Sequence, residues 1–513
     1  MKNLRYYLHS LLFALIAPIA AYMTRENVRI HAEPFSIWRT LLVCIIFFII
    51  SAILSYLLSR DHLSAGMLAT FAVLGVIYTQ ELFFLVLLLI VSAWGILAIV
   101  RRQFAVSQLY VASSMLALVL AVYFFAEYIL FVNSVGWDRN KSMAARIEIT
   151  ASDAAIEPKP DIYYIVLDAY GGSEMLAKLH GFDNSEFISA LEERGFVVPG
   201  ASRSNYTRTI HSVGSSLNMQ YLDSVEQVMH DSILWWPIEG TFWYSETRRF
   251  LESQGYQTVV VASGWSFTTI NDADVYKQPY PIFLNEFEEF FFQNTNLSLF
   301  GFLQDFGVSI PSYDVHRRIV SYGFEQLSEI PQLDSPKFTL VHIVSPHPPF
   351  VFDTEGNPID PNYPFTIADN RYLITPPSKY QQGYLDQLTH VNDQTIQAVD
   401  SILKNSSTPP IIILQGDHGP GIFLDAQTST PPCFYERYTI LNAYHLPGVN
   451  PNAIPQDVTP VNTFRIIFNH YFSAGLEILP NHQYFSLPET VHQFEDVTDR
   501  IDDACVFPEE SVK

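Results

Sequence analysis

Cysteine and basic residues are both scarce in this chain, and each shortage excludes a class of protein. Three cysteines in 513 residues are too few for a small fold held together by a disulfide framework. Cys433 and Cys505 could still pair in an oxidising compartment, although their separation in sequence says nothing about their distance in space. Lysine and arginine total 29 against 52 aspartate and glutamate residues. Because a nucleic-acid partner requires a basic surface, this acidic balance argues against nucleic acid.

Long apolar runs are absent after about residue 133, whereas they dominate the chain before it. A helix of roughly 20 apolar residues crosses the hydrocarbon core of a bilayer. Runs of about that length occur at about residues 6–23, 36–59, 63–79, 82–100 and 106–132. We therefore predict a membrane-embedded bundle of about five transmembrane helices.

The positions of the cations predict which way this bundle faces. Cytoplasmic ends of transmembrane helices are enriched in lysine and arginine. With a cytoplasmic N-terminus, the cations that fall on that side are Lys2, Arg5, Arg60, Arg101 and Arg102. Arg25, Arg29 and Arg39 argue the other way, because they lie in the first external loop. We predict a multi-pass protein of the cytoplasmic (inner) membrane, with everything after about residue 133 on its outer side.

The predicted domains are a transmembrane domain at 1–133, a linker or membrane-surface segment at 134–160 and an extracytoplasmic domain at 161–513. Apolar strands in the last domain read "DIYYIVLD", "YQTVVVASG", "FTLVHIVSP", "PPIIILQGD" and "YTILNAYHLPG". Helices are expected between and after them, near residues 184–194, 284–294, 315–328, 380–404 and 461–472. Uninterrupted apolar strands that alternate with helices predict the α/β class, a mostly parallel sheet sandwiched by helices.

Polar side chains gather where three of these strands end. Asp168 ends the first strand, His342 and His347 lie in and just after "FTLVHIVSP", and Asp417 and His418 end "IIILQGDHG". Parallel sheets place ligand sites beyond the carboxyl ends of their strands. Two carboxylates and an imidazole suit one divalent metal ion, zinc or manganese, with magnesium also possible. The simpler alternatives are an ordinary strand-to-turn pair for Asp417 and His418, a structural turn for His347 and a core position for His342.

A nucleophile is expected in the hydroxyl-rich segment "SNYTRTIHSVGSSLNMQYL", residues 204–222. Its start is rich in hydroxyl groups and its remainder is amphipathic, as in a helix that opens on Ser or Thr. A hydroxyl at a helix N-terminus lies at the positive end of the helix dipole, which favours its alkoxide. We predict Thr207 as the nucleophile, and Thr209 and Ser212 compete with it for this role.

This set of residues resembles the alkaline phosphatase and sulfatase superfamily, and within it the membrane-anchored lipoteichoic acid synthases and phosphoethanolamine transferases. The resemblance rests on Asp168, a threonine at the head of the next helix, the Ser-Pro-His turn and the Gly-Asp-His-Gly strand end. It implies that Asp168, Thr207, Asp417 and His418 coordinate the metal. It also implies that His347 binds the transferred phosphate group or serves as an acid, with His342 as a further candidate for binding substrate.

Two departures from these families limit what the resemblance implies. Phosphoethanolamine transferases carry another histidine after the Asp-His pair, whereas "GPGIFLDAQTSTPPCFYERYTILNAY" contains none. Arg437 could replace it as a substrate-binding residue, or could instead pair with Glu436 or Asp425 on the surface. The segment "TRTIH" lacks the C/S-x-P-x-R setting of formylglycine sulfatases, so a sulfate ester substrate is disfavoured.

The sequence thus predicts a metal-dependent phospho-transferase. The resemblance implies that a phosphoglycerol or phosphoethanolamine headgroup passes from a membrane phospholipid donor to an envelope glycan or lipid acceptor through a phospho-threonine intermediate. Two alternatives stay open. One is a hydrolase, either a phosphodiesterase or a sulfatase-type enzyme, in which water replaces the acceptor. The other is a non-catalytic membrane scaffold that carries a sulfatase-like domain.

Overall fold

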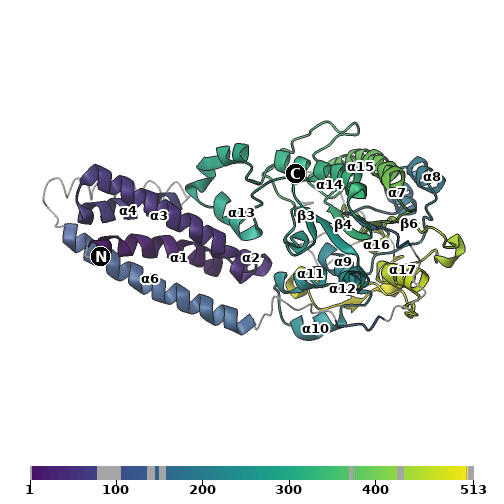
Figure 1. Ribbon diagram of the computed structural model, residues 1–513, viewed down its shortest axis with the longest axis horizontal. Helices are drawn as coiled ribbons and strands as arrows, with labels where there is room; N and C mark the ends of the chain where they lie inside the picture. The colour runs from purple at the N-terminus through teal and green to yellow at the C-terminus, as the bar shows by residue number, and fades with distance from the viewer. Residues whose placement is uncertain are drawn as a thin grey trace. The chain divides into compact units, whose positions relative to one another are not determined.

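The computed structural model of the protein describes residues 3–77, 106–135, 145–149, 158–368, 374, 376–423, 433–503 and 505. The chain divides into two compact units, whose helices and strands are labelled in Figure 1. The first, here called the membrane unit, consists of Met1–Asp138, Leu234–Pro237 and Tyr280–Ile310. The second, here called the α/β unit, consists of Arg139–Ile233, Ile238–Pro279 and Pro311–Lys513.

Apolar helices make up the membrane unit, as the long apolar runs predict. Its described α-helices are α1 (Leu8–Thr24), α2 (Glu26–His31), α3 (Trp38–Ser59), α4 (His62–Ile77), α6 (Val106–Val135) and α13 (Glu286–Gln293). Short 3₁₀ helices accompany them, namely η1 (Leu4–Tyr7), η2 (Pro34–Ile37) and η5 (Asn296–Phe306). Three helical stretches in the described part of the chain are long and apolar enough to cross a membrane: Leu4–Thr24, Pro34–Ser59 and Val106–Val135.

The other two predicted spans compare differently with the structure. The described part of the run at 63–79 lies in α4, which has 16 described residues, fewer than the roughly 20 that cross a hydrocarbon core. The run at 82–100 lies outside the described residues. The structure therefore shows a membrane protein with apolar N-terminal helices, and a count of about five spans is not confirmed.

The composition of α3 explains why these helices belong in lipid. Apolar residues cover all sides of this helix, and Ile46, Ile53 and Leu58 remain 48%, 55% and 82% exposed. A helix that is apolar all round lies either in a protein core or in a membrane. Because these side chains are exposed on the protein, lipid is the environment that suits them. The helix ends at Arg60, whose left-handed backbone (φ 56°) starts the turn into α4.

The membrane unit also contains residues from the second half of the chain, which the predicted domain boundaries did not anticipate. Phe287 and Phe291 of α13 are buried in the same apolar cluster as Tyr22 of α1. The Phe287 and Tyr22 rings lie 6.0 Å apart. Arg39, one of the cations that argued against the predicted orientation, donates to Glu288 Oε1 at 2.6 Å. Its charge is thus compensated within the unit.

A six-stranded sheet organises the α/β unit, in the order β3-β2-β4-β1-β5-β6. The strands are β1 (Ile162–Leu167), β2 (Gln257–Val261), β3 (Val275–Lys277), β4 (Lys337–Ile343), β5 (Ile411–Gly416) and β6 (Asn442–His445). The first five pair in parallel, and β6 runs antiparallel to β5. The prediction of a mostly parallel sheet is confirmed.

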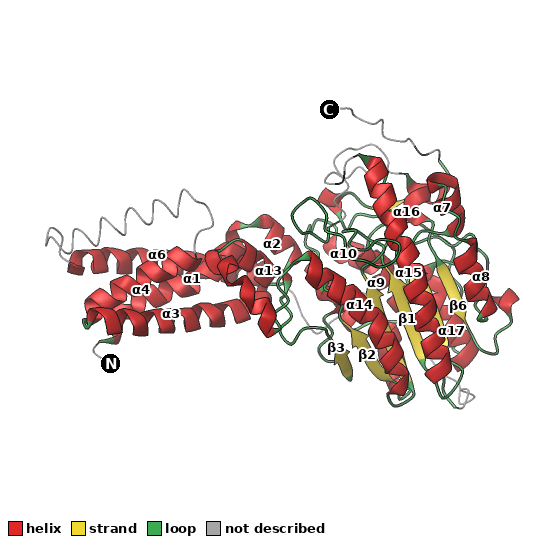
Figure 2. Ribbon diagram, turned by 90° about the horizontal axis from the view of Figure 1, so that it is seen from above, coloured by secondary structure: helices red, strands yellow, loops and turns green. Residues whose placement is uncertain are grey.

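Helices cover both faces of this sheet (Figures 1 and 2). One face is covered by α8 (Ser185–Glu193), α14 (Tyr313–Glu329) and α15 (Pro377–Asn405). The other is covered by α9 (Thr209–Asn218), α12 (Glu246–Ser253) and α17 (Thr463–Phe472). Successive side chains of a strand point to opposite faces. In β1, Tyr163 and Ile165 join the apolar cluster of α14 and α15, whereas the Tyr164 ring lies 5.2 Å from that of Phe464 in α17.

The helices predicted near 184–194, 284–294, 315–328, 380–404 and 461–472 correspond to α8, α13, α14, α15 and α17. Smaller helices complete the unit: α7 (Ser173–His180), α10 (Asp223–Met229), α11 (Gly240–Trp243) and α16 (Phe434–Tyr438). Most of the predicted linker at 134–160 lies outside the described residues. Its part at 145–149 has no regular secondary structure, and Ala145 N–H donates to Ser224 Oγ at 3.1 Å.

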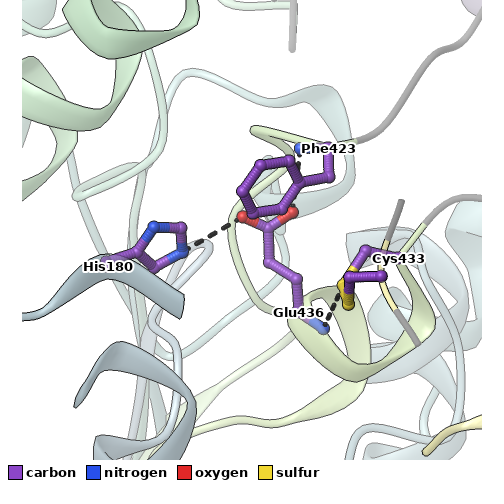
Figure 3. Close-up of a disulfide and its surroundings, with 5 residues drawn as sticks. His180, Phe423, Cys433 and Glu436 are labelled. Atoms are coloured by element: carbon purple, nitrogen blue, oxygen red, sulfur yellow. Dashed lines mark hydrogen bonds and ion pairs between the residues drawn. A yellow bond between two sulfur atoms is a disulfide. The ribbon is translucent and has the colours of Figure 1, made fainter. Parts of the chain in front are cut away.

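A disulfide joins Cys433 to Cys505, with their Cα atoms 4.7 Å apart (Figure 3). The predicted possibility that these cysteines pair is therefore confirmed. Cys433 is also the N-cap of α16, because its Sγ accepts the backbone N–H of Glu436 at 3.3 Å. The crosslink thus attaches the C-terminal segment to the start of a helix that reaches the candidate site.

Candidate active site

Strand register brings two carboxylates together at one edge of the sheet. β1 pairs with β5 so that Leu167 lies opposite Gly416, and the next residues along these strands are Asp168 and Asp417. Both carboxylates are buried, with 1% and 0% of their surface exposed. Gly416 lets the chain after Asp168 pass close to β5, because a Cβ atom at residue 416 would collide with the backbone carbonyl of Tyr170. The predicted convergence of the two strand ends is present.

Backbone groups orient the Asp417 carboxylate. Ala169 N–H and His418 N–H both donate to its Oδ1, each at 2.9 Å. Ala169 reaches this position with a left-handed backbone (φ 63°), a conformation that costs energy for a residue with a side chain. With Oδ1 held by two N–H groups, Oδ2 is the oxygen that faces His418, whose Nε2 lies 3.3 Å away.

His418 presents one defined nitrogen to the two carboxylates. Its Nδ1 lies 3.0 Å from its acceptor, the carbonyl oxygen of Gly419, so Nδ1 carries the proton and Nε2 has the lone pair. Nε2 lies 3.6 Å from Asp168 Oδ1. One ligand atom each from Asp168, Asp417 and His418 lies within 4.8 Å of the others, and all three residues are buried.

These three residues fit a divalent cation. Two buried carboxylates side by side repel each other unless a positive charge compensates them. Two carboxylate oxygens and a neutral imidazole nitrogen form a donor set that zinc and manganese accept. Histidine ligands of metal ions commonly donate from their other ring nitrogen to a backbone carbonyl, as His418 Nδ1 does to Gly419.

The Thr209 hydroxyl contacts this group. Its Oγ1 lies 3.4 Å from His418 Nε2, and Thr209 is the first residue of α9. Thr207, the predicted nucleophile, precedes the N-cap Arg208, and its backbone carbonyl accepts a hydrogen bond from Arg437 Nε at 3.0 Å. Ser212 lies 3.0 Å from the Ser204 hydroxyl, which in turn donates to the Asp417 carbonyl. The three candidate hydroxyls thus have distinct surroundings, and the Thr209 hydroxyl meets His418.

His347 reaches the site through a turn rich in proline. The His347 N–H donates to the Asp168 carbonyl at 3.0 Å, and the His347 carbonyl accepts a hydrogen bond from Gln387 Nε2 of α15 at 3.0 Å. Its Nδ1 lies 2.5 Å from the Pro348 carbonyl, which makes Nδ1 the donor and Nε2 the second nitrogen. The ring centroid is 6.3 Å from that of His418. The structure places His347 beside the metal-type group, and Gln387 is a supporting residue for which the sequence offered no signal.

His342 lies on the same face of the sheet as the site. It pairs with Val166 in the register of β4 with β1, one residue before the last pair, Leu167 with Ile343. Its Nε2 is 3.2 Å from Asp168 Oδ2, and its side chain is 1% exposed. Burial lowers the pKa of His342 to about 4, so the ring beside the carboxylate is neutral. The two predictions for His342 were a core position and a place in the site. The histidine is in the core, and it also contacts a site residue.

Arg437 is buried and belongs to the site. It is 6% exposed, its Nη1 donates to the Gly419 carbonyl at 3.0 Å, and its Nη2 lies 3.2 Å from His418 Nε2. Surface pairing with Glu436 is not what the structure shows, because Glu436 lies 3.2 Å from His180 instead (Figure 3). The other surface candidate, Asp425, lies outside the described residues.

Comparison with known families now identifies the class of protein. The sulfatase family model matches residues 160–460. The chain belongs to the sulfatase family. This membership confirms the predicted superfamily and the prediction of a sulfatase-like enzyme. No curated protein matches this sulfatase-family chain in sequence.

Solved structures of other proteins are similar to parts of this chain. The zinc complex of the C-terminal periplasmic domain of EcEptC from Escherichia coli is 11% identical, with a TM-score of 0.46, and the match covers 70% of this chain and 98% of that one. The lipooligosaccharide phosphoethanolamine transferase A of Neisseria meningitidis is 11% identical, with a TM-score of 0.42 and coverage of 91% and 84%. The phosphonate monoester hydrolase of Agrobacterium radiobacter is 13% identical, with a TM-score of 0.39 and coverage of 64% and 80%.

Proposed function

We propose that this protein is a metal-dependent phospho-transferase that moves a phosphoglycerol or phosphoethanolamine headgroup from a membrane phospholipid to an envelope glycan or lipid. The observation that carries the proposal is the buried group of Asp168, Asp417 and His418, with the Thr209 hydroxyl 3.4 Å from His418 Nε2. Helices that are long enough to cross a membrane in the same chain support a lipid as the donor. The active site would then face the outer side of the inner membrane.

Asp168, Asp417 and His418 are the residues that would hold the cation, with zinc or manganese favoured and magnesium possible. When bound, a divalent cation would neutralise charge on the nonbridging oxygens of the phosphate and lower the pKa of a neighbouring hydroxyl. The neutral His342 ring next to Asp168 Oδ2 would keep that carboxylate oriented.

The Thr209 hydroxyl is the proposed nucleophile, in preference to Thr207. It opens α9, where the helix dipole and the unpaired N–H groups of the first turn favour negative charge. Its oxygen attacks the phosphorus of the lipid headgroup, and the phosphorus–oxygen bond to diacylglycerol breaks. The threonine proton is lost to solvent or to a nearby base, and the released diacylglycerol oxygen takes up a proton. A phosphodiester on Thr209 is the intermediate.

An acceptor hydroxyl completes the reaction. It attacks the phosphorus, the bond to the threonine oxygen breaks, and Thr209 regains a proton while the acceptor hydroxyl loses one. His347 is the proposed acid and base in both steps, because its Nδ1 is committed to the Pro348 carbonyl and its Nε2 can exchange the proton. Arg437 supplies fixed positive charge beside His418, where it can bind a nonbridging oxygen of the phosphate.

The test uses full-length protein in nanodiscs with a headgroup-labelled phospholipid. Transfer predicts that diacylglycerol appears faster when an acceptor is added, and that mass spectrometry finds a headgroup-phosphate adduct on Thr209. Thr209→Ala should abolish the adduct. Thr207→Ala should still form the adduct, although at a different rate, because the contact of residue 207 with Arg437 is made by its backbone carbonyl. An adduct on Thr207 would transfer the nucleophile to that residue. Release of free headgroup at full rate in water alone would replace the transferase by a hydrolase.

A further inference from the structure

The segment Tyr280–Ile310 belongs to the membrane unit although it comes from the middle of the later domain. Its start and end are joined, because Ile282 N–H donates to the Gly307 carbonyl at 3.1 Å and Ser309 N–H donates to the Ile282 carbonyl at 2.9 Å. Gly307 makes the turn into this pairing with a left-handed backbone (φ 84°). The segment, here called the excursion, therefore begins and ends at neighbouring positions in the structure.

The start of this excursion is attached at the outer ends of the spanning helices. Asn285 Nδ2 donates to the Ser36 carbonyl at 3.0 Å, just before α3 begins. Arg39 in the first turn of α3 donates to the Phe283 carbonyl at 2.7 Å as well as to Glu288. Exposed aromatic side chains at this level, Phe35 and Trp38, are typical of a membrane–water boundary.

The middle of the excursion is attached deeper. Asn296 Nδ2 donates to the Gly75 carbonyl in α4 at 2.7 Å. α3 and α4 pack together as antiparallel neighbours joined by a short turn. At a rise of about 1.5 Å per residue, α3 climbs about 32 Å from Ser59 to Trp38, whereas α4 has climbed only about 20 Å from His62 to Gly75. Asn296 therefore lies about 12 Å below the level of Trp38, within a hydrocarbon core of about 30 Å.

The sequence of the excursion suits this depth. All three acidic residues of α13 lie in its first turn, at the outer level. The next stretch, residues 290–304, contains no charged side chain. Beyond Asn296, Phe302 and Phe306 are 55% and 73% exposed and their ring centroids lie 6.4 Å apart. Phe302 lies within this uncharged stretch, and Phe306 follows its first charged residue, Asp305. Large exposed aromatic side chains are costly in water and stable in lipid.

We propose that residues 290–306 form a re-entrant segment that enters the outer leaflet of the bilayer and places Phe302 and Phe306 in lipid. The occupant of this apolar surface is the acyl region of membrane phospholipid, continuous with the lipid around α3. Because Asn296 is deep and Gly307 is back beside Ile282, Phe302 lies deeper than Phe306. This inference concerns the membrane unit and stands whatever reaction the α/β unit performs.

The test places a fluorescent label in the full-length protein. In a Cys44→Ala background, Phe302→Cys and Phe306→Cys are each labelled with NBD and reconstituted into nanodiscs that contain phospholipids spin-labelled at shallow or deep acyl positions. Ile53→Cys on α3 is the lipid-facing control, and Lys404→Cys on α15 is the control in the α/β unit. Both phenylalanines are exposed, so each substitution is expected to leave the fold intact.

We expect quenching at both phenylalanine positions to approach that at Ile53 and to exceed that at Lys404 several-fold. The deep spin label should act more strongly at position 302 than at 306. Emission and quenching at both positions equal to those at Lys404 would overturn the proposal. So would a blue-shifted emission that no lipid label quenches, because a protein surface, either the α/β unit or a second copy, would then cover this face.

Discussion

Each end of strand β1 carries a buried aspartate, and the two aspartates have opposite electrostatic surroundings. Asp161 precedes the strand and pairs with Lys337, whose Nζ lies 2.5 Å from Oδ2 and whose N–H donates to Oδ1 at 3.1 Å. Asp168 follows the strand and lies among Asp417, His418 and His342. One carboxylate is neutralised by a lysine of the protein, and the other faces a second carboxylate and histidines. The first arrangement stabilises the fold, whereas the second is prepared for an added cation.

The strongest test of this contrast removes a carboxylate from the second group. Asp417→Asn should reduce activity more than about 100-fold. Loss of a residue that only hydrogen-bonds to a metal ligand costs about 10–100-fold, and loss of a ligand itself should cost more. Bound metal, measured by elemental analysis of the purified protein, should fall with it. In metal-free protein the same change should leave thermal stability equal or higher, because it removes repulsion between Asp168 and Asp417. Unchanged metal content and activity would show that Asp417 does not hold a catalytic metal, and absence of both from the parent protein would favour the scaffold alternative.

Removing the carboxylate at the other end should have the opposite profile. Asp161→Asn leaves Lys337 buried with one partner fewer, which typically costs about 3–5 kcal/mol. Chemical unfolding followed by fluorescence should show this loss, while the folded protein retains its metal. The double variant Asp161→Asn with Lys337→Met should recover much of the stability, because it also removes the buried ammonium that the single variant leaves without its carboxylate. A single variant as stable as the parent would show that this pair is not structural.

The disulfide is attached to the helix that carries Arg437, a residue of the site. Cys433 and Cys505 are 72 residues apart, and a crosslink of this kind contributes about 2–4 kcal/mol. Replacing both by alanine should lower the unfolding midpoint and also reduce activity, because Cys433 caps the helix that carries Arg437. Cys44→Ala is the matched control without a crosslink. Stability that is indifferent to both the double variant and a reductant would contradict this assignment.

Acid should destabilise the site end through its neutral histidines. Burial, reinforced by the nearby His347 and Arg317, lowers the pKa of His316 to about 3. The unfolded chain binds a proton at this residue below about pH 6.5 while the folded protein does not, so stability falls as pH drops from about 6.5 towards 3. At pH 4.5 this amounts to about 2–3 kcal/mol.

His316→Gln should remove most of that difference between pH 7.5 and 4.5 in thermal unfolding midpoints. The matched control is His230→Gln, which changes an exposed histidine on α10's C-terminal side and should leave the pH dependence as it was. Equal pH dependence in the parent and in His316→Gln would show that His316 is not the group responsible.

Much of the α/β unit and its site could be predicted because parallel strands obey simple geometry. An uninterrupted apolar strand is buried on both faces, and polar residues just after it lie at one edge of the sheet. Asp168, Asp417 and His418 were found in this way, and the structure brings them together. Whether His342 belongs to the site was harder to predict, because alternation along a strand that is buried on both faces does not reveal which face holds the site.

The helix start shows the limit of such reasoning. The sequence favours Thr207 over its competitor Thr209, yet an α-helix turns 100° per residue, so a small shift of its first residue changes which hydroxyl faces His418. That first residue depends on tertiary contacts, including the bond from Arg437 to the Thr207 carbonyl. Arg437 itself was expected on the surface as readily as in the site, because its burial depends on a helix that begins at a disulfide.

Chain composition alone determined that this protein has a lipid-facing N-terminal part and an α/β unit with acids at its strand ends, because hydrophobic periodicity and strand direction are local properties. Tertiary structure alone decided that residues 280–310 join the membrane unit, that Thr209 meets His418 and that Arg437 is buried. Each of these depends on contacts between residues far apart in sequence. Such contacts form only when separate elements pack, and no local pattern encodes their partners.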